Sequence, residues 1–207
     1  MPNYEFPVQT ETRTLQAPGG VYHYPALTGL KSTSVQVQIN NQIRQLAQQL
    51  LRYQQQYLSG SNPESIGNYE IKTNERAIFS HILSSYAYSS PMAHGNTLAK
   101  SQTFNVRTGR KYSLGDLFKP GSAYTAKLSA IVSAQIKQRD IQLLGNFPGV
   151  APDQDYYLAD KSLVVYYQLY AITPYYYGLP MFPISVYDLQ NEAAEGGPLD
   201  ILSQQLA

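Results

Sequence analysis

The sequence has no cysteine and no tryptophan among its 207 residues. The absence of cysteine excludes a disulfide framework, a thiolate nucleophile and a zinc–thiolate site. No stretch approaches the roughly 18 consecutive apolar residues of a membrane-spanning helix. Residues 1–16 carry charges and no apolar run, so we expect no signal peptide in this chain. These absences leave the cellular compartment open.

Charge is scarce as well. Asp, Glu, Lys and Arg make up 14% of the residues and the net charge is +1, whereas about a quarter of the residues are charged in an average globular protein. A chain so evenly balanced has no broad electrostatic field to hold nucleic acid or an anionic membrane. We therefore expect neither of these as a partner.

Tyrosine is abundant, with 19 copies. A tyrosine side chain buries a large ring while its hydroxyl stays available to water or to a partner. A surface rich in tyrosine and poor in charge suits contact with proteins or sugars. The alternative is that the rings fill strands, where aromatic residues are common.

Apolar periodicity predicts two long helices, over residues 34–58 and 123–144. Strand patterns occur in runs and do not alternate with helices, at residues 8–16, 21–25, 66–73, 77–89, 98–107, 155–159, 162–172 and 181–186. This order predicts an α+β fold that is mainly antiparallel sheet with two long helices packed on it. The expected core includes Ile39, Ile43, Leu46, Leu50, Leu117, Leu128, Ile131, Val132 and Val164.

The same pattern indicates one compact unit with two subdomains. A strand–helix–strands subdomain is expected over residues 1–107 and a helix–strands subdomain over 108–190. Residues 191–207 contain Glu-Gly-Gly-Pro and weak periodicity, so we expect a weakly ordered tail there.

A series of short motifs in fixed order carries a family resemblance, namely YPALTG at 24–29, AHG at 93–95, FNV at 104–106, DLF at 116–118, DYYL at 155–158, LVVYY at 163–167 and ITPY at 172–175. Together they resemble the paired domains of unknown function in RsiV-type anti-sigma factors, which also precede the catalytic domain of PdaC-type peptidoglycan deacetylases. The resemblance covers roughly residues 20–190. Pro91 and Met92 stand where that family usually has two glycines.

The resemblance implies an α+β domain outside the cell membrane of a Gram-positive bacterium. In RsiV-type proteins this domain is a receptor for lysozyme, and binding exposes the chain to proteolysis. The present sequence shows no sigma-binding region, membrane helix or deacetylase metal motif. The resemblance therefore extends to the sensor domain and does not extend to the enzyme.

The three histidines, His23, His81 and His94, show no HxH or HExxH spacing. A metal site needs several converging ligands, so we expect no metal and no cofactor. A structural role for His94 is favoured, in which Gly95 permits a positive φ and the imidazole holds backbone groups. The GxSxG nucleophile motif and the phosphate-binding GxxxxGK[ST] motif are absent too. We therefore expect a protein that is not an enzyme, and the rival hypothesis is a hydrolase or deacetylase of cell-wall glycan.

The segment Pro174–Pro180, with sequence PYYYGLP, is the best candidate for binding. Two prolines reduce its freedom in the unfolded chain, so little entropy is lost on binding. Three successive tyrosines cannot all face inward, and exposed aromatic residues form interface hot spots. The alternative is a structural loop packed on its own sheet. We therefore expect the contact to centre on Pro174, Tyr175, Tyr176 and Tyr177, with His94 near its rim.

We thus expect an extracytoplasmic, non-catalytic sensor or binding domain whose ligand is a protein or glycan of the cell envelope, with lysozyme the first candidate by resemblance. A structural protein of a spore or cell envelope is the alternative. A less favoured alternative is an accessory domain of a peptidoglycan-modifying enzyme. The sequence leaves the oligomeric state undefined.

Overall fold

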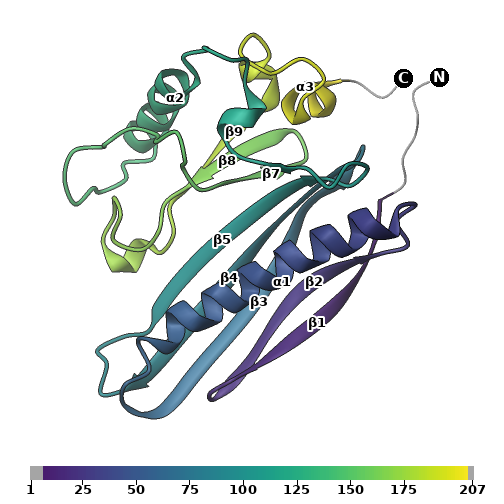
Figure 1. The fold of residues 1–207 in the computed structure, drawn as a ribbon. Coiled ribbons are helices and arrows are strands. Elements are labelled where there is room, and N and C mark those ends of the chain that lie inside the picture. The colour runs from purple at the N-terminus through teal and green to yellow at the C-terminus, as the bar shows by residue number, and fades with distance from the viewer. Residues whose placement is uncertain (1–6, 205–207) are drawn as a thin grey trace. The chain divides into compact units, whose positions relative to one another are not determined.

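The computed structural model describes residues 7–204, and its helices and mostly antiparallel sheets confirm the α+β class (Figure 1). These residues divide into two compact units, 7–111 and 112–204. Residues 1–6 and 205–207, which the expected subdomain and tail limits include, lie outside the described residues. Each unit is described by itself.

The first unit is built on a sheet whose strand order follows the chain order. Its strands are β1 (Gln9–Ala17), β2 (Gly20–Thr28), β3 (Ser61–Glu75), β4 (Ile78–Ser90), β5 (Asn96–Asn105) and the short β6 (Lys111–Tyr112), where the chain passes to the second unit. The β1–β2, β3–β4 and β4–β5 pairs are antiparallel. Strands β2 and β3 pair in parallel, because helix α1 (Thr33–Gln55) carries the chain back between them.

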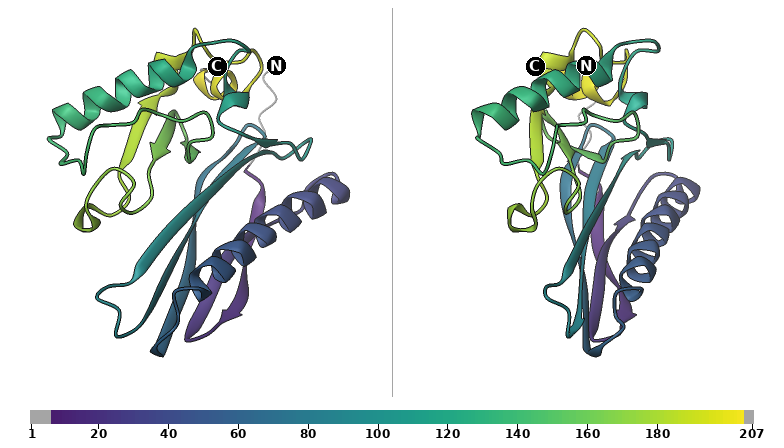
Figure 2. Two further views of the ribbon diagram at one scale, coloured as in Figure 1. Left: turned by 60° about the vertical axis from the view of Figure 1, so that its left-hand side comes forward. Right: turned by 90° about the vertical axis from the view of Figure 1, so that its left-hand side faces the viewer.

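Helix α1 lies along one face of this sheet (Figure 2). It begins after Ser32, whose side-chain oxygen accepts a hydrogen bond from the Val35 amide at 3.3 Å. Its buried residues recur every three or four positions, at Ile39, Ile43, Ala47, Leu50 and Gln54. This single stripe, apolar except for Gln54, is why the helix packs with one face on the sheet and leaves its Gln-rich face outside.

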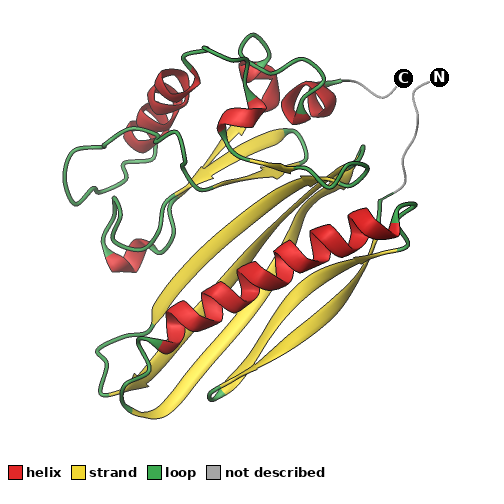
Figure 3. Cartoon of the chain, in the orientation of Figure 1, coloured by secondary structure: helices red, strands yellow, loops and turns green. Residues whose placement is uncertain are grey.

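The second unit contains a three-stranded antiparallel sheet with a helix packed beside it (Figure 3). Its elements are η1 (Gly115–Leu117), α2 (Tyr124–Gln138), β7 (Tyr156–Ala159), β8 (Ser162–Tyr166), η2 (Tyr175–Tyr177), β9 (Met181–Ser185), η3 (Val186–Leu189) and α3 (Pro198–Ser203). The hairpin expected around Asp160 is confirmed, with Ala159 paired to Ser162. Strand β8 then pairs with β9.

Two expected boundaries in this unit are wrong. Helix α2 ends at Gln138 and not at 144, because Asp140 has a φ of 48° and turns the chain out of the helix. Strand β8 ends at Tyr166 and not at 172. Within its described residues, the segment expected to be a tail contains the short helix α3, and Leu199 and Leu202 of this helix are fully buried.

The expected core is largely confirmed. Seven of the nine expected residues are buried, namely Ile39, Ile43, Leu50, Leu117, Leu128, Val132 and Val164. Leu46 and Ile131 are partly buried. Within residues 7–204 there is no helix with both the length and the apolar character needed to span a membrane.

Candidate functional site

The segment after Thr173 forms a tight turn. Residues 175–177 make one 3₁₀ turn, η2, in which the Tyr177 amide donates to the Pro174 carbonyl and the Gly178 amide donates to the Tyr175 carbonyl, both at 3.0 Å. Gly178 closes the turn with a φ of 74°, which favours glycine. The tyrosines therefore radiate from a helical turn and do not alternate along an extended segment.

The three tyrosines of the turn have different surroundings. Tyr175 lies beside Tyr170, with ring centroids 5.9 Å apart. The Tyr177 hydroxyl accepts a hydrogen bond from Nη2 of Arg139 at 3.1 Å. The side chain of Tyr176, by contrast, is 76% exposed. The turn thus holds two of its tyrosines against the protein and presents the third to solvent.

Arg139 ties the end of α2 to this turn. Besides Tyr177, its guanidinium donates through Nη1 to the Met181 carbonyl at 2.9 Å and lies over the Phe182 ring, 5.3 Å from the centroid. A planar guanidinium with several donors can make these contacts together. Arg139 was not among the residues expected from the sequence, because no motif marks a residue just beyond a helix end as the partner of a turn 38 positions later.

Tyr167 supports the turn from the protein side. Its amide donates to the Pro180 carbonyl at 3.1 Å and its hydroxyl donates to the Gly149 carbonyl at 3.0 Å. Burial raises the pKa of Tyr167 to about 12. The ring meets Phe182 edge to face at a centroid distance of 6.0 Å. Tyr167 is therefore a structural anchor of the loop.

Two further apolar side chains are exposed on the segments next to the turn. Tyr170 is 51% exposed and Leu144 is 57% exposed. The Leu144 amide donates to the Ile172 carbonyl at 3.0 Å, which fixes the loop after α2 beside the segment that leads into the turn. We call Leu144, Tyr170, Tyr175, Tyr176 and Tyr177 the tyrosine patch. Sequence reasoning missed Leu144 and Tyr170, since neither lies in the proline-bracketed segment.

His94 lies in the β4–β5 loop of the first unit, whereas the tyrosine patch belongs to the second. Neither unit by itself brings the two together. The imidazole is exposed, and Nδ1 lies 3.0 Å from the Gly95 carbonyl oxygen. The expected positive φ at Gly95 is wrong. Gly95 is instead required by packing, because a Cβ there would lie 2.1 Å from the Tyr86 ring.

Titratable side chains are dispersed in both units. No group of three His, Asp or Glu side chains within residues 7–204 is close enough to hold a metal ion. His81, on β4, is fully buried and its pKa is lowered to about 3 by desolvation, so the imidazole is neutral near pH 7. The described geometry thus favours an aromatic contact surface as the candidate site.

The described elements define an α+β domain built mainly of antiparallel sheet. Residues 115–187, which hold α2, the second sheet and the turn, match a family model described as "Protein of unknown function (DUF3298)". This match is consistent with the expected domain of unknown function. No curated protein matches the chain significantly.

Two solved structures share the fold over nearly the whole chain. A member of the DUF3298 family from Bacteroides fragilis superposes with a TM-score of 0.68 at 12% identity, covering 98% of each chain. A DUF3298 family protein from Pseudomonas aeruginosa superposes with a TM-score of 0.66 at 19% identity, covering 94% of this chain and 96% of that one. At such identities the likeness shows the fold alone.

Proposed function

We propose that this protein is a non-catalytic, extracytoplasmic binding domain whose contact surface is Pro174 and the Tyr175–Tyr177 turn. The observation that carries the proposal is the 76% exposure of Tyr176 on a turn whose two neighbouring tyrosines are held in place. A large ring that stays in solvent on an ordered backbone is the usual chemistry of an interface anchor. The ligand is a protein or glycan of the cell envelope, and lysozyme is the first candidate through the family resemblance.

The physical basis of binding is preorganisation. The turn is closed by two backbone hydrogen bonds, and Arg139 restrains its last tyrosine. Little conformational entropy is then lost when a partner covers Tyr176. The tyrosine patch itself carries no charge, so we expect affinity to depend on shape and ring burial and to change modestly with salt.

The rival reading is an enzyme acting on acetylated cell-wall glycan. We propose against it because the tyrosine patch contains no carboxylate or imidazole, the usual acid and base groups of glycan hydrolysis. Purified protein should contain no stoichiometric zinc and should not turn over acetylated glycan oligomers. Turnover that depended on His94 together with bound zinc would refute the non-catalytic proposal.

Calorimetric titration of the full chain with lysozyme tests the binding proposal, at low and moderate salt. The triple variant Tyr175→Ala, Tyr176→Ala, Tyr177→Ala should lose binding. Tyr187→Ala is the matched control, because Tyr187 is 46% exposed in the same unit but lies beyond the opposite end of β9. Binding that survives the triple substitution would rule out the turn as the anchor, and no binding by the unmodified chain would rule out lysozyme as the ligand.

A further inference from the structure

Strand β1 is the end strand of the six-stranded sheet. Its partner on one side is β2, and no described strand pairs with its other side. Most of its nine residues are exposed. A strand edge of this kind presents unpaired N–H and C=O groups that can pair with another strand.

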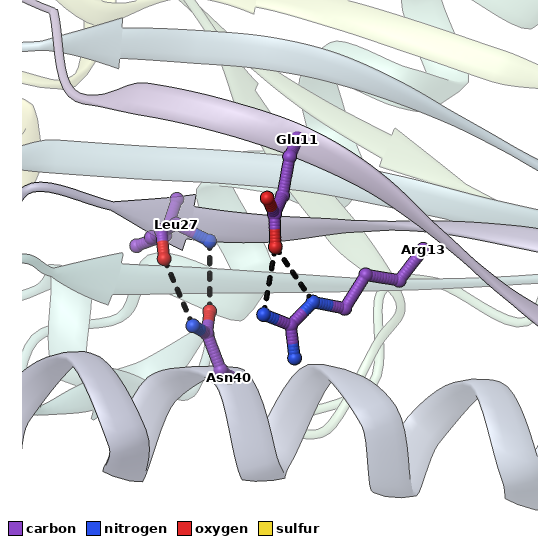
Figure 4. A network of polar contacts seen from close by, with 4 residues as sticks. All are labelled: Glu11, Arg13, Leu27 and Asn40. Carbon is purple, nitrogen blue, oxygen red and sulfur yellow. Dashed lines mark hydrogen bonds and ion pairs between the residues drawn. The ribbon is translucent and has the colours of Figure 1, made fainter.

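The residues that present those groups can be identified from Asn40 on α1. Its Oδ1 accepts from the Leu27 amide at 2.8 Å and its Nδ2 donates to the Leu27 carbonyl at 2.9 Å (Figure 4). Leu27 therefore turns its backbone groups away from β1, and its partner Thr10 forms a non-hydrogen-bonded pair with it. By alternation along an antiparallel ladder, Thr10, Thr12 and Thr14 direct their N–H and C=O groups to the free edge.

Pro25 agrees with this assignment. It is the partner of Thr12 in the β1–β2 register and has no amide hydrogen. At a non-hydrogen-bonded pair the backbone groups of both residues point away from the partner strand, so proline can occupy one position without loss of a β1–β2 hydrogen bond. Pro25 is therefore compatible with a non-hydrogen-bonded pair at Thr12, in which the Thr12 backbone groups point to the free edge. The N–H of Thr12 is thus available at the edge.

The side chains along this edge have a symmetric pattern. Residues 10–14 read Thr-Glu-Thr-Arg-Thr, so Glu11 and Arg13 lie at equal distances on either side of Thr12. An antiparallel copy of the strand centred on Thr12 would therefore place Arg13 opposite Glu11. Within one chain Arg13 Nη2 lies 2.7 Å from Glu11 Oε1, and both side chains are about half exposed, which leaves the charges accessible to a second partner (Figure 4).

We propose that β1 pairs antiparallel with β1 of a second copy of this chain, across a two-fold axis at Thr12, and so joins two six-stranded sheets. In this register Thr12 faces Thr12 of the second copy, and Glu11 faces Arg13 of the second copy on both sides of the axis. Opposite charges directly across a strand pair stabilise it, whereas an axis at Glu11 or at Arg13 would place like charges opposite each other. Charge complementarity therefore favours one register, centred on Thr12, and one partner for the β1 edge, which is β1 of a second copy.

A two-fold contact of this kind closes on itself. It uses the same edge on both copies and leaves no further β1 edge open, so it produces dimers and not filaments. The proposal is independent of the tyrosine patch and goes beyond the proposed binding function. It concerns the first unit alone.

Single cysteine substitutions give a direct test, because the chain contains no other cysteine. In the proposed register the two copies of residue 12 face each other with Cα atoms about 5.5 Å apart, within the range that a disulfide spans. The two copies of residue 10 lie about 14 Å apart along the strand. Mild oxidation should therefore link Thr12→Cys into a covalent dimer much faster than the matched control Thr10→Cys. Equal rates for the two variants would overturn the register.

A charge exchange supplies the second test, read by sedimentation equilibrium up to about 1 mM, since a small interface can be weak. The unmodified chain should dimerise, Glu11→Arg should be monomeric because Arg then faces Arg, and Glu11→Arg with Arg13→Glu should dimerise again. Thr12→Pro should also be monomeric while remaining folded by circular dichroism, because it removes an outward N–H alone. A monomeric unmodified chain, or an exchanged double variant that stays monomeric, would overturn the proposal.

Discussion

The imidazole of His81 lies parallel to the ring of Phe104, with an interplanar angle of 7° and a centroid distance of 6.2 Å. The Phe79 ring lies 5.6 Å away on the same strand. Both ring nitrogens of His81 are buried and accept or donate no hydrogen bond within the described residues. A group in such a site is retained as the neutral base, because protonation would place an unpaired charge in the core.

The first prediction concerns pH. The pKa of His81 is about 3 in the folded protein and near 6.5 in the unfolded chain, so the unfolded state binds more protons between these values. Its contribution to stability is present above pH 6.5 and is lost as pH falls toward 3, at about 1.4 kcal/mol per pH unit at most. Urea unfolding at pH 7, 5.5 and 4.5 should show that the free energy of unfolding falls less with decreasing pH in His81→Leu than in the unmodified chain. Identical slopes for the unmodified chain and His81→Leu would contradict the prediction.

The second prediction concerns a buried amide. Gln54 is fully buried on α1; its Nε2 donates to the Ser85 carbonyl at 3.0 Å and to the Asn96 carbonyl at 3.2 Å, while its Oε1 accepts from Asn96 Nδ2 at 3.0 Å. Gln54→Leu would remove these buried hydrogen bonds and should lower the free energy of unfolding by about 1–3 kcal/mol. Gln49→Leu, at an exposed position of the same helix, should change it by less than about 0.5 kcal/mol. Chemical denaturation measures the free energy of unfolding of both variants, and equal values for the two would contradict the prediction.

The third prediction compares two apolar residues of α2. Leu128 is fully buried, whereas Ile131 is partly buried. Leu128→Ala should destabilise the protein by about 2–5 kcal/mol because it leaves a cavity, and Ile131→Ala should cost clearly less because solvent already reaches that side chain. Urea melts measure both losses. Equal losses would mean that the two side chains are packed alike.

The fourth prediction concerns the order of the tyrosine turn. Arg139→Met removes the donors to Tyr177 and to the Met181 carbonyl. Hydrogen exchange at the amides of Tyr177 and Gly178 should then become several-fold faster, because a turn that has lost hydrogen bonds opens more often. Lys137→Met, an exposed change in the same helix turn, serves as the control. Unchanged exchange in Arg139→Met would show that the backbone turn holds without the guanidinium.

Local patterns in the sequence were sufficient for much of the fold. The stripe from Ile39 to Leu50 predicted α1 because helical spacing is a property of neighbouring residues. The same reasoning failed at Gln138, where the periodic pattern continues but the backbone of Asp140 turns away. Periodicity reports which residues suit a helix, and the tertiary contacts of the following loop decide where the helix stops.

The site shows the same division. Pro174 and Pro180 marked a stiff tyrosine loop from composition alone, because proline restricts the backbone wherever it occurs. Which tyrosine is free could not be read from three identical residues in a row. That outcome depends on Arg139 and Tyr170, which reach the turn from other parts of the chain.

The sequence by itself determined the α+β class, the two helices, most of the core and the position of the tyrosine loop, since each rests on interactions between residues close in the chain. The tertiary structure decided the parallel pairing of β2 with β3, the burial of His81 without a hydrogen-bond partner among residues 7–204, the burial of α3 and the exposure of Tyr176. Each of these depends on contacts between segments far apart in sequence, and such contacts override local preference because burial and hydrogen bonding outweigh the propensity of a single residue.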